Sequence, residues 1–198
     1  MSNRPATTKE RILDAAEGLM LAKSFHSVGL NEILAAVNVP KGSFYHHFES
    51  KEQFGVEMLK HYVADATAWR KTFLLSSSPE PDPFLRLMSF LEGMVAKVLG
   101  NQGKCPCLIS KLSSEVADFS EAMREVLAQG NREWIRIYEQ VLDEAVTKKK
   151  IKQTAKPALL AMLLHDLMNG AMQRSSIERS AAPLREAIAH LRTILCIF

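Results

Sequence analysis

The chain has 198 residues, of which 47% are hydrophobic and 24% are charged, and its formal net charge is +3. These values are ordinary for a globular protein and argue against a largely disordered chain. The longest apolar run, 158–164, is too short to cross a bilayer, and three cysteines make no disulfide framework, so we expect a cytoplasmic protein with no membrane partner.

The N-terminal section predicts three helices. Thr7 or Thr8 can cap the first one, in which apolar residues recur at helical spacing. A second, short helix is predicted over 30–37. The segment 38–40 breaks it, because the residue before a proline is pushed out of the helical region. A third helix follows over 41–48, and two short helices after a longer one are typical of a helix-turn-helix.

The rest of the chain also has helical patterns. Ser50 is a natural N-cap for a long helix that starts at Lys51 and runs to about Leu75. No stretch alternates as a strand does, so the prediction is an all-α fold with about nine helices. The remaining helices are expected over 84–99, 106–117, 120–147, 154–174 and 182–197.

The helix predicted over 41–48 has an unusual surface. Phe44 and Phe48 share one face, because residues four apart lie above each other on a helix. Ser43, His46 and His47 then point outward. A helix that displays Ser, Tyr and His beside a Lys suits recognition of a base edge and its neighbouring phosphates. The first sixty residues carry seven basic and seven acidic side chains, so DNA affinity must come from the placement of charge.

Three segments, 29–33 (GLNEI), 39–48 (VPKGSFYHHF) and 50–52 (SKE), resemble the DNA-binding domain of the TetR family of bacterial transcriptional regulators. The resemblance implies a helix-turn-helix domain over 1–50 and a helical ligand-sensing and dimerisation domain over 51–198. It further implies a dimeric, sequence-specific repressor that a signal releases from a palindromic DNA operator. Such a protein is not an enzyme and needs no catalytic residue, cofactor or metal.

The resemblance also implies roles by position. The start of the third helix would meet the DNA, Ser43 and His46 would face bases, and the other polar side chains would hold phosphates. Lys51 lies in the first turn of its helix, where free backbone N–H groups help to bind an anion. The implied DNA-contacting residues are Val39, Pro40, Lys41, Gly42, Ser43, Tyr45, His46, His47 and Lys51.

A second informative stretch contains two cysteines. If Cys105 lies near an N-cap, Pro106 takes the first helical position and Cys107 the next. Free N–H groups and the helix dipole then favour the thiolate form of Cys107. Lys111, four residues further on, and Lys104 add positive charge. Because a thiolate reacts with electrophiles and oxidants, we expect a sensor made of Cys107, Cys105 and Lys111.

Residues 107–124 are also similar to the electrophile-responsive repressors associated with N-ethylmaleimide reductase genes, in which a cysteine at the position of Cys107 takes part in sensing. Two alternatives remain. Cys107 is an inert buried residue and an apolar ligand is the trigger, or the protein is a thiol-dependent enzyme with His165 as the base. An apolar pocket would draw on Met88, Phe90, Met94, Phe119, Trp134, Met162, Met168 and Met172.

Overall fold

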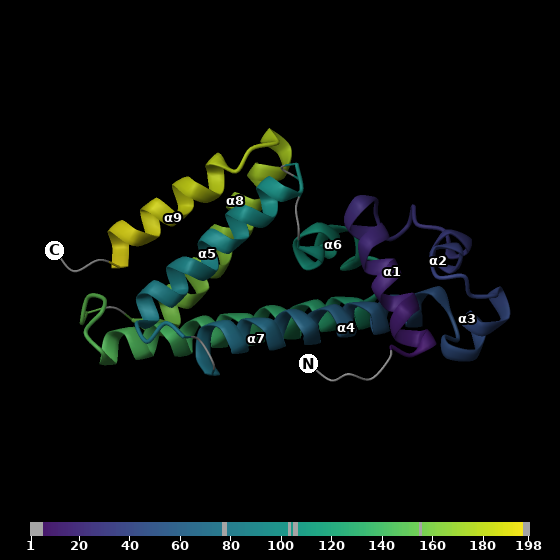
Figure 1. Cartoon of the computed structure of the whole chain (residues 1–198), viewed down its shortest axis with the longest axis horizontal. Coiled ribbons are helices and arrows are strands. Elements are labelled where there is room, and N and C mark those ends of the chain that lie inside the picture. The colour runs from purple at the N-terminus through teal and green to yellow at the C-terminus, as the bar shows by residue number, and fades with distance from the viewer. Residues whose placement is uncertain (1–5, 77–78, 103, 105–106, 155, 196–198) are drawn as a thin grey trace. The chain divides into compact units, whose positions relative to one another are not determined.

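The computed structural model describes residues 6–76, 79–102, 104, 107–154 and 156–195 (Figure 1). The described residues form nine α-helices and no strand, which confirms the all-α prediction. None of these helices combines the length and hydrophobicity that crossing a membrane requires. The helices are α1 (Thr8–Ala22), α2 (Leu30–Ala36), α3 (Lys41–His47), α4 (Lys51–Lys71), α5 (Pro83–Gly100), α6 (Leu108–Val116), α7 (Glu121–Thr147), α8 (Pro157–Glu178) and α9 (Ala182–Leu195), and a π-helical segment, Thr72–Ser76, prolongs α4.

The chain divides into two compact units, and the long helices α4 and α7 contribute residues to both. The N-terminal unit consists of Met1–Asp65 and Cys107–Ala128, and the C-terminal unit consists of Ala66–Pro106 and Gln129–Phe198. The N-terminal unit therefore holds α1 to α3 together with α6, although about sixty residues separate α3 from α6 along the chain.

The turn between α2 and α3 is built by backbone hydrogen bonds. Asn38 has φ of 53°, a left-handed conformation that asparagine tolerates better than most residues. Its N–H donates to the Ala35 carbonyl at 3.3 Å, and the Val39 N–H donates to the Leu34 carbonyl at 3.0 Å. This pair of bonds is a Schellman motif, which satisfies the last carbonyls of α2 and ends that helix before α3 begins.

Aromatic rings from α3 and α4 form the centre of the N-terminal core. Phe44, Phe48 and Phe54 are 2%, 1% and 1% exposed. Their ring centroids lie 4.9 to 5.3 Å apart, within the range of favourable aromatic contacts. Apolar residues of α1 and α2, such as Ile12 and Ile33, complete this core, against which α3 packs its inner face.

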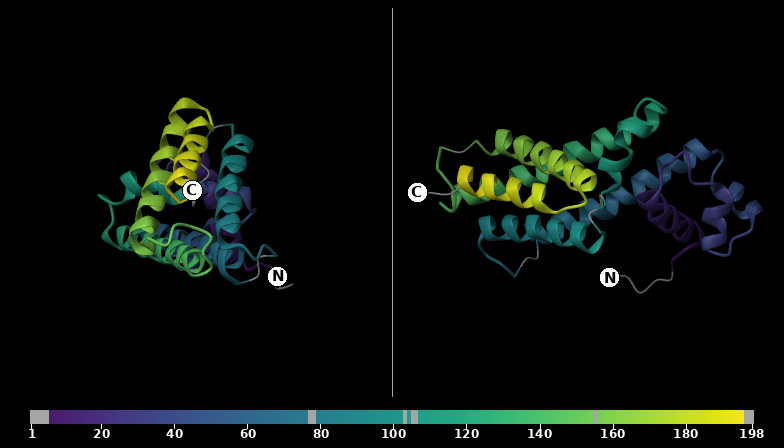
Figure 2. Two further views of the ribbon diagram at one scale, coloured as in Figure 1. Left: turned by 90° about the vertical axis from the view of Figure 1, so that its left-hand side faces the viewer. Right: turned by 90° about the horizontal axis from the view of Figure 1, so that it is seen from above.

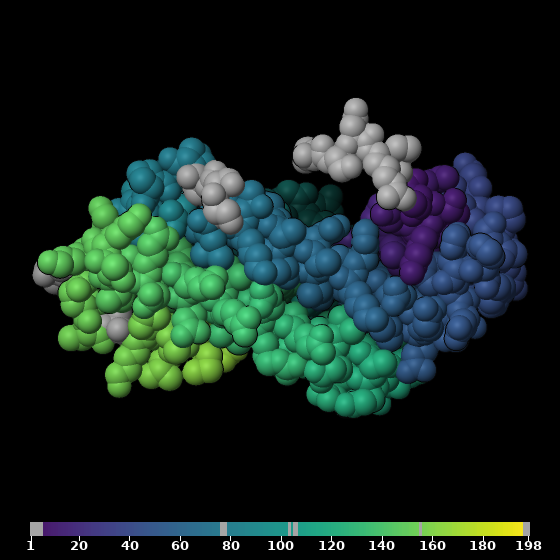
Figure 3. All heavy atoms as spheres, turned by 90° about the horizontal axis from the view of Figure 1, so that it is seen from below, coloured from purple at the N-terminus to yellow at the C-terminus, as the bar shows by residue number. Residues whose placement is uncertain are grey.

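The second segment of the N-terminal unit packs on the first part of α4. The Leu108 N–H donates to the Tyr62 hydroxyl at 3.2 Å, and the Ser120 hydroxyl donates to Glu52 at 2.6 Å. Figure 3 shows the teal and green atoms of this segment directly against the blue atoms of α4. α6 is thus joined to the unit that carries α3.

The C-terminal unit packs α8 and α9 as antiparallel neighbours, with α5 beside α9 (Figure 2). Asp82 caps α5 by accepting from the Phe84 N–H at 2.9 Å, and it also forms an ion pair with Lys150 at 2.9 Å. In the same unit the indole N–H of Trp134 donates to Thr67 at 2.8 Å, and the Arg70 guanidinium stacks 3.6 Å from the centre of the Trp134 ring system.

Candidate nucleic-acid interface

Helix α3 has one buried face and one open face, as the spacing predicted. Phe44 is buried, whereas Lys41, Tyr45 and His46 are exposed and Ser43 is half-buried. Among the described residues, Lys41 has no hydrogen bond and no ion pair. We call the exposed side of α3 with the turn before it the α3 surface, made of Val39, Pro40, Lys41, Gly42, Ser43, Tyr45, His46 and His47.

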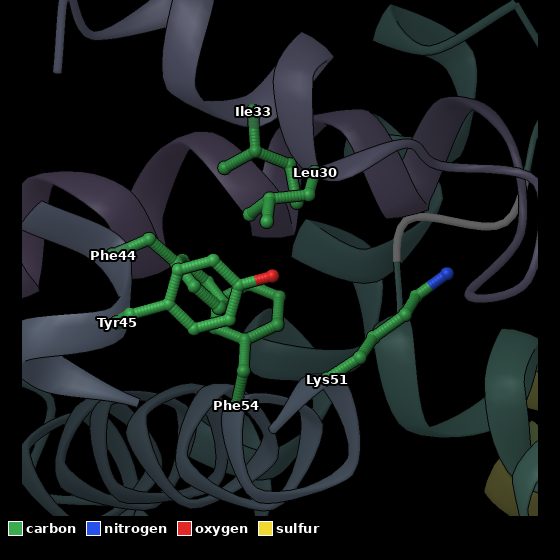
Figure 4. A pocket seen from close by; sticks show the side chains of 6 residues that line it. All are labelled: Leu30, Ile33, Phe44, Tyr45, Lys51 and Phe54. Atoms are coloured by element: carbon green, nitrogen blue, oxygen red, sulfur yellow. The ribbon is translucent and has the colours of Figure 1, made fainter. Parts of the chain in front are cut away.

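A small pocket of about 50 Å³ lies beside the α3 surface (Figure 4). Tyr45 lies along its apolar wall, with its ring centroid 5.4 Å from that of Phe44. Leu30 lines the same pocket with an aliphatic side chain. Tyr45 is 57% exposed.

The ammonium of Lys51 points away from the aromatic rings of this pocket (Figure 4). It donates to the carbonyl oxygens of His26 and Val28 at 3.4 and 3.3 Å and lies 5.3 Å from the centre of the Phe25 ring. An ammonium has three donors. Lys51 therefore binds the turn between α1 and α2 and has one donor left for an anion.

The position of Cys107 differs from the prediction. Cys107 has extended backbone angles (φ −110°, ψ 116°) and is the N-cap residue of α6, not a residue of its first turn. Its side chain makes no capping hydrogen bond to α6, and the Leu108 N–H donates to the Tyr62 hydroxyl. Cys107 is 7% exposed.

The other two proposed sensor residues are Lys111 and Cys105. The Lys111 ammonium donates to the Leu21 carbonyl at the end of α1. The prediction for Cys105 falls outside the described residues. Phe119, one of the residues that an apolar pocket could draw on, lies in the N-terminal unit with its ring centroid 4.8 Å from that of His26.

His165, the base of the enzyme alternative, lies on α8 in the C-terminal unit. It is 8% exposed, and its Nδ1 atom is 3.2 Å from Asp166. The Asn169 amide lies 3.2 Å from the other ring nitrogen. Within the described part of the chain, no group of three His, Cys, Asp or Glu side chains could hold a metal ion.

Sequence reasoning missed one residue that positions the α3 surface. Arg11 of α1 donates to the Val37 carbonyl at 2.6 Å and so supports the turn after α2. The two residues are 26 positions apart, and no local pattern predicts such a contact.

Two sequence profiles of known families match the chain. Residues 12–58 match the bacterial regulatory proteins of the tetR family, and residues 83–191 match the tetracyclin repressor-like C-terminal domain. The chain is 37% identical over 188 residues to the HTH-type transcriptional repressor NemR of Escherichia coli K12, with 95% of this chain and 94% of NemR covered. It is 30% identical over 176 residues to the repressor DhaR of Mycobacterium sp. strain GP1, with 89% and 86% covered.

The fold agrees with these matches. The crystal structure of the reduced form of E. coli NemR superimposes with a TM-score of 0.86 and 34% identity, with 96% of this chain and 98% of that chain covered. The two family matches, the similarity to NemR and the fold therefore agree, and the chain belongs to the tetR family of bacterial regulatory proteins.

Proposed function

We propose that the protein is a dimeric transcriptional repressor that binds a near-palindromic operator through the α3 surface. The observation that carries this proposal is the two-sided character of α3, in which buried Phe44 holds the helix while Lys41, Tyr45 and His46 remain exposed. A short helix held in this way can enter the major groove with its polar side toward the bases.

The polar residues divide into two roles. Ser43 and His46 contact base edges and carry the sequence information, because base edges differ between base pairs. Tyr45, His47 and Lys51 contact phosphates, which fix the register of the helix without reading sequence. The turn before α3 and its first residues come nearest to the DNA; they are Val39, Pro40, Lys41 and Gly42.

A selected operator tests these roles. The duplex that the full-length wild-type protein enriches from a random library serves as the probe, and fluorescence anisotropy measures its Kd. Ser43→Ala and His46→Ala should each weaken binding by about 1–3 kcal/mol and relax the preference at one position of each half-site. Ser114→Ala on α6 is the matched control, since Ser114 is exposed outside the α3 surface. Unchanged affinity and preference in both α3 variants would contradict the proposal.

The dimer is proposed to form through α8 and α9. Leu159, Leu163 and Ile177 of α8 are 56%, 44% and 81% exposed, and Ile194 of α9 is 42% exposed. Apolar side chains exposed along adjacent helices mark an interaction surface. A twofold dimer presents two α3 surfaces, which reach successive major grooves when they are about 34–36 Å apart.

The proposed signal is modification of Cys107. Its thiolate adds to an electrophilic alkene such as N-ethylmaleimide: a sulfur–carbon bond forms, the carbon–carbon double bond becomes single, and the adjacent carbon takes a proton from water. Cys107 is 7% exposed at the start of α6, so the added group displaces the neighbouring packing. This displacement occurs within the N-terminal unit itself, which then loses affinity for the operator.

A second trigger is an apolar ligand in the C-terminal unit. The aromatic cluster of Trp69, Phe73 and Phe90, with ring centroids 5.0 to 5.9 Å apart, favours it. Under this alternative Cys107 is inert, and Cys107→Ser leaves the response to the ligand intact. Under the thiol mechanism the same substitution abolishes the response to alkylating agents.

A further inference from the structure

Glu115, near the end of α6, binds the turn between α1 and α2. Its two carboxylate oxygens accept from the backbone N–H groups of Phe25 and His26 at 3.1 and 2.8 Å, and the His26 ring nitrogen Nδ1 lies 2.7 Å from one of them. Partial burial acts to raise the pKa of Glu115, but the hydrogen bonds from His26 and Phe25 outweigh it and lower that pKa. A carboxylate that accepts hydrogen bonds from two N–H groups of one turn fixes both the position and the orientation of that turn.

The same turn is bound from α4. The Lys51 ammonium donates to the carbonyl oxygens of His26 and Val28, so His26 is held through its N–H by α6 and through its C=O by α4. The turn leads directly into α2, which begins at Leu30. A shift of the turn therefore moves α2 and, through the Schellman motif, α3.

A second contact supports the first. The Phe119 ring lies 4.8 Å from the His26 ring and 6.0 Å from the Phe25 ring, in a tilted or edge-on arrangement. Together, Glu115 and Phe119 cover the turn from one side, and both belong to the segment that starts at Cys107.

We propose that Glu115 is a positioning residue for operator recognition, which holds the α1–α2 turn so that the α3 surface keeps the register needed to read bases. The role rests on the operator binding proposed above. Glu115 follows Cys107 by eight residues, and residues 108–116 form one continuous helix. A displacement of the start of α6 therefore also displaces Glu115.

Glu115→Gln tests this role, because an amide has only one acceptor oxygen and cannot accept both N–H groups in the same way. Asp118→Asn is the matched control. It removes the same charge three residues away, and Asp118 is exposed with no hydrogen bond or ion pair within the described ranges. Both full-length variants are titrated with the duplex selected by the wild-type protein and with a scrambled duplex of equal length.

We expect Glu115→Gln to raise the Kd for the selected duplex about tenfold and the Kd for the scrambled duplex less than twofold. Reading of base edges requires the register of α3, whereas non-specific binding requires only charge near phosphates. A merely structural loss of folded protein would raise both Kd values by the same factor. The amide protons of Phe25 and His26 should also exchange about tenfold faster in the variant, and Asp118→Asn should change neither quantity.

Three results would overturn the role of Glu115. They are an unchanged ratio of the two Kd values, an equal rise of both, and amide exchange at Phe25 and His26 that matches the wild-type protein. If the wild-type chain itself selects no duplex, the proposed function fails and this role fails with it. A failure of Glu115 alone is seen when the wild-type protein selects a duplex and Glu115→Gln binds it equally well.

Discussion

At the scale of single residues, Lys51 binds the α1–α2 turn and is also proposed to contact the DNA. Its ammonium binds two carbonyl oxygens of the α1–α2 turn, and its third donor is available to a phosphate. The family resemblance implied only the phosphate contact. The turn contact could not be predicted, because Lys51 and His26 are 25 positions apart and meet only in the folded unit.

Lys51→Ala should therefore have two effects. It should lower the slope of log K against log salt concentration by about 1, because one phosphate contact is lost. It should also lower the thermal midpoint, because the turn loses its cation. Lys60→Ala, an exposed lysine further along α4, is the control and should leave the slope unchanged. If the salt slope of Lys51→Ala is unchanged, Lys51 makes no phosphate contact and only supports the α1–α2 turn.

Glu17 of α1 provides a test of pH dependence. Burial raises the pKa of Glu17 above 4.5, and the neighbouring Asp14 and Asp65 act in the same direction while His61 opposes them. The folded state therefore favours the protonated form, so its contribution to stability is present at low pH and is lost as pH rises through the folded pKa.

Glu17→Gln should accordingly stabilise the protein near pH 7, by roughly 1–3 °C in thermal midpoint, and should have little effect near pH 4. Thermal unfolding followed by circular dichroism at several pH values measures the difference. Glu49→Gln, which removes an exposed charge, is the control. A variant less stable than the wild-type protein at pH 7 would contradict the prediction.

At the scale of elements, local patterns predicted α3 well. The spacing of Phe44 and Phe48 assigned its buried face, and both side chains are buried. The start of α6 was predicted less well. The preference of proline for the first helical position suggested a start at 106, whereas α6 begins at Leu108, whose N–H is bound by Tyr62 from α4. A contact between residues 46 positions apart is invisible to local reasoning.

The packing of α4 against the rest of the N-terminal unit depends on Gly55. A Cβ atom at this position would lie 2.6 Å from the Phe25 ring and would also meet Met123 of α7. Phe25 is 1% exposed and has little room to move. Gly55→Ala should destabilise the protein by about 1–3 kcal/mol, as overpacking of a core does.

Gly18→Ala is the matched control for this substitution. Gly18 lies within α1, where an added Cβ meets no atom within 4 Å. Because glycine in a helix costs conformational entropy, this variant should be more stable by about 0.5–1 kcal/mol. Urea denaturation of both variants measures the change in the free energy of unfolding. A Gly55→Ala protein as stable as the wild-type protein would contradict the packing described around α4.

At the scale of the whole molecule, the two compact units do not follow the order of the chain. The segment after residue 106 returns to the N-terminal unit, so the proposed sensor cysteine and the α3 surface belong to the same unit. The sequence predicted a boundary near residue 50 because the helix-turn-helix motif ends there. It contained no sign that residues 107–128 pack with α1 to α4, since that packing rests on contacts between distant residues such as Glu52 and Ser120.

The proposed dimer makes a prediction at the same scale. Leu163→Glu places a charge on an α8 side chain that is 44% exposed, and it should convert the dimer to a monomer and abolish tight operator binding. Light scattering coupled to size-exclusion chromatography measures the mass. Leu85→Glu on α5 is the control, because Leu85 is 46% exposed but lies outside α8 and α9. A dimeric Leu163→Glu protein with unchanged affinity would argue against this interface.

The most direct test of repression released through the thiol is an operator titration before and after alkylation. Full-length wild-type protein and Cys107→Ser are each titrated with the selected duplex, with and without prior treatment with N-ethylmaleimide. We expect treatment to raise the wild-type Kd by tenfold or more and to leave the Kd of Cys107→Ser unchanged. An equal loss of affinity in both proteins, or no loss in the treated wild-type protein, would contradict a signal that acts through Cys107.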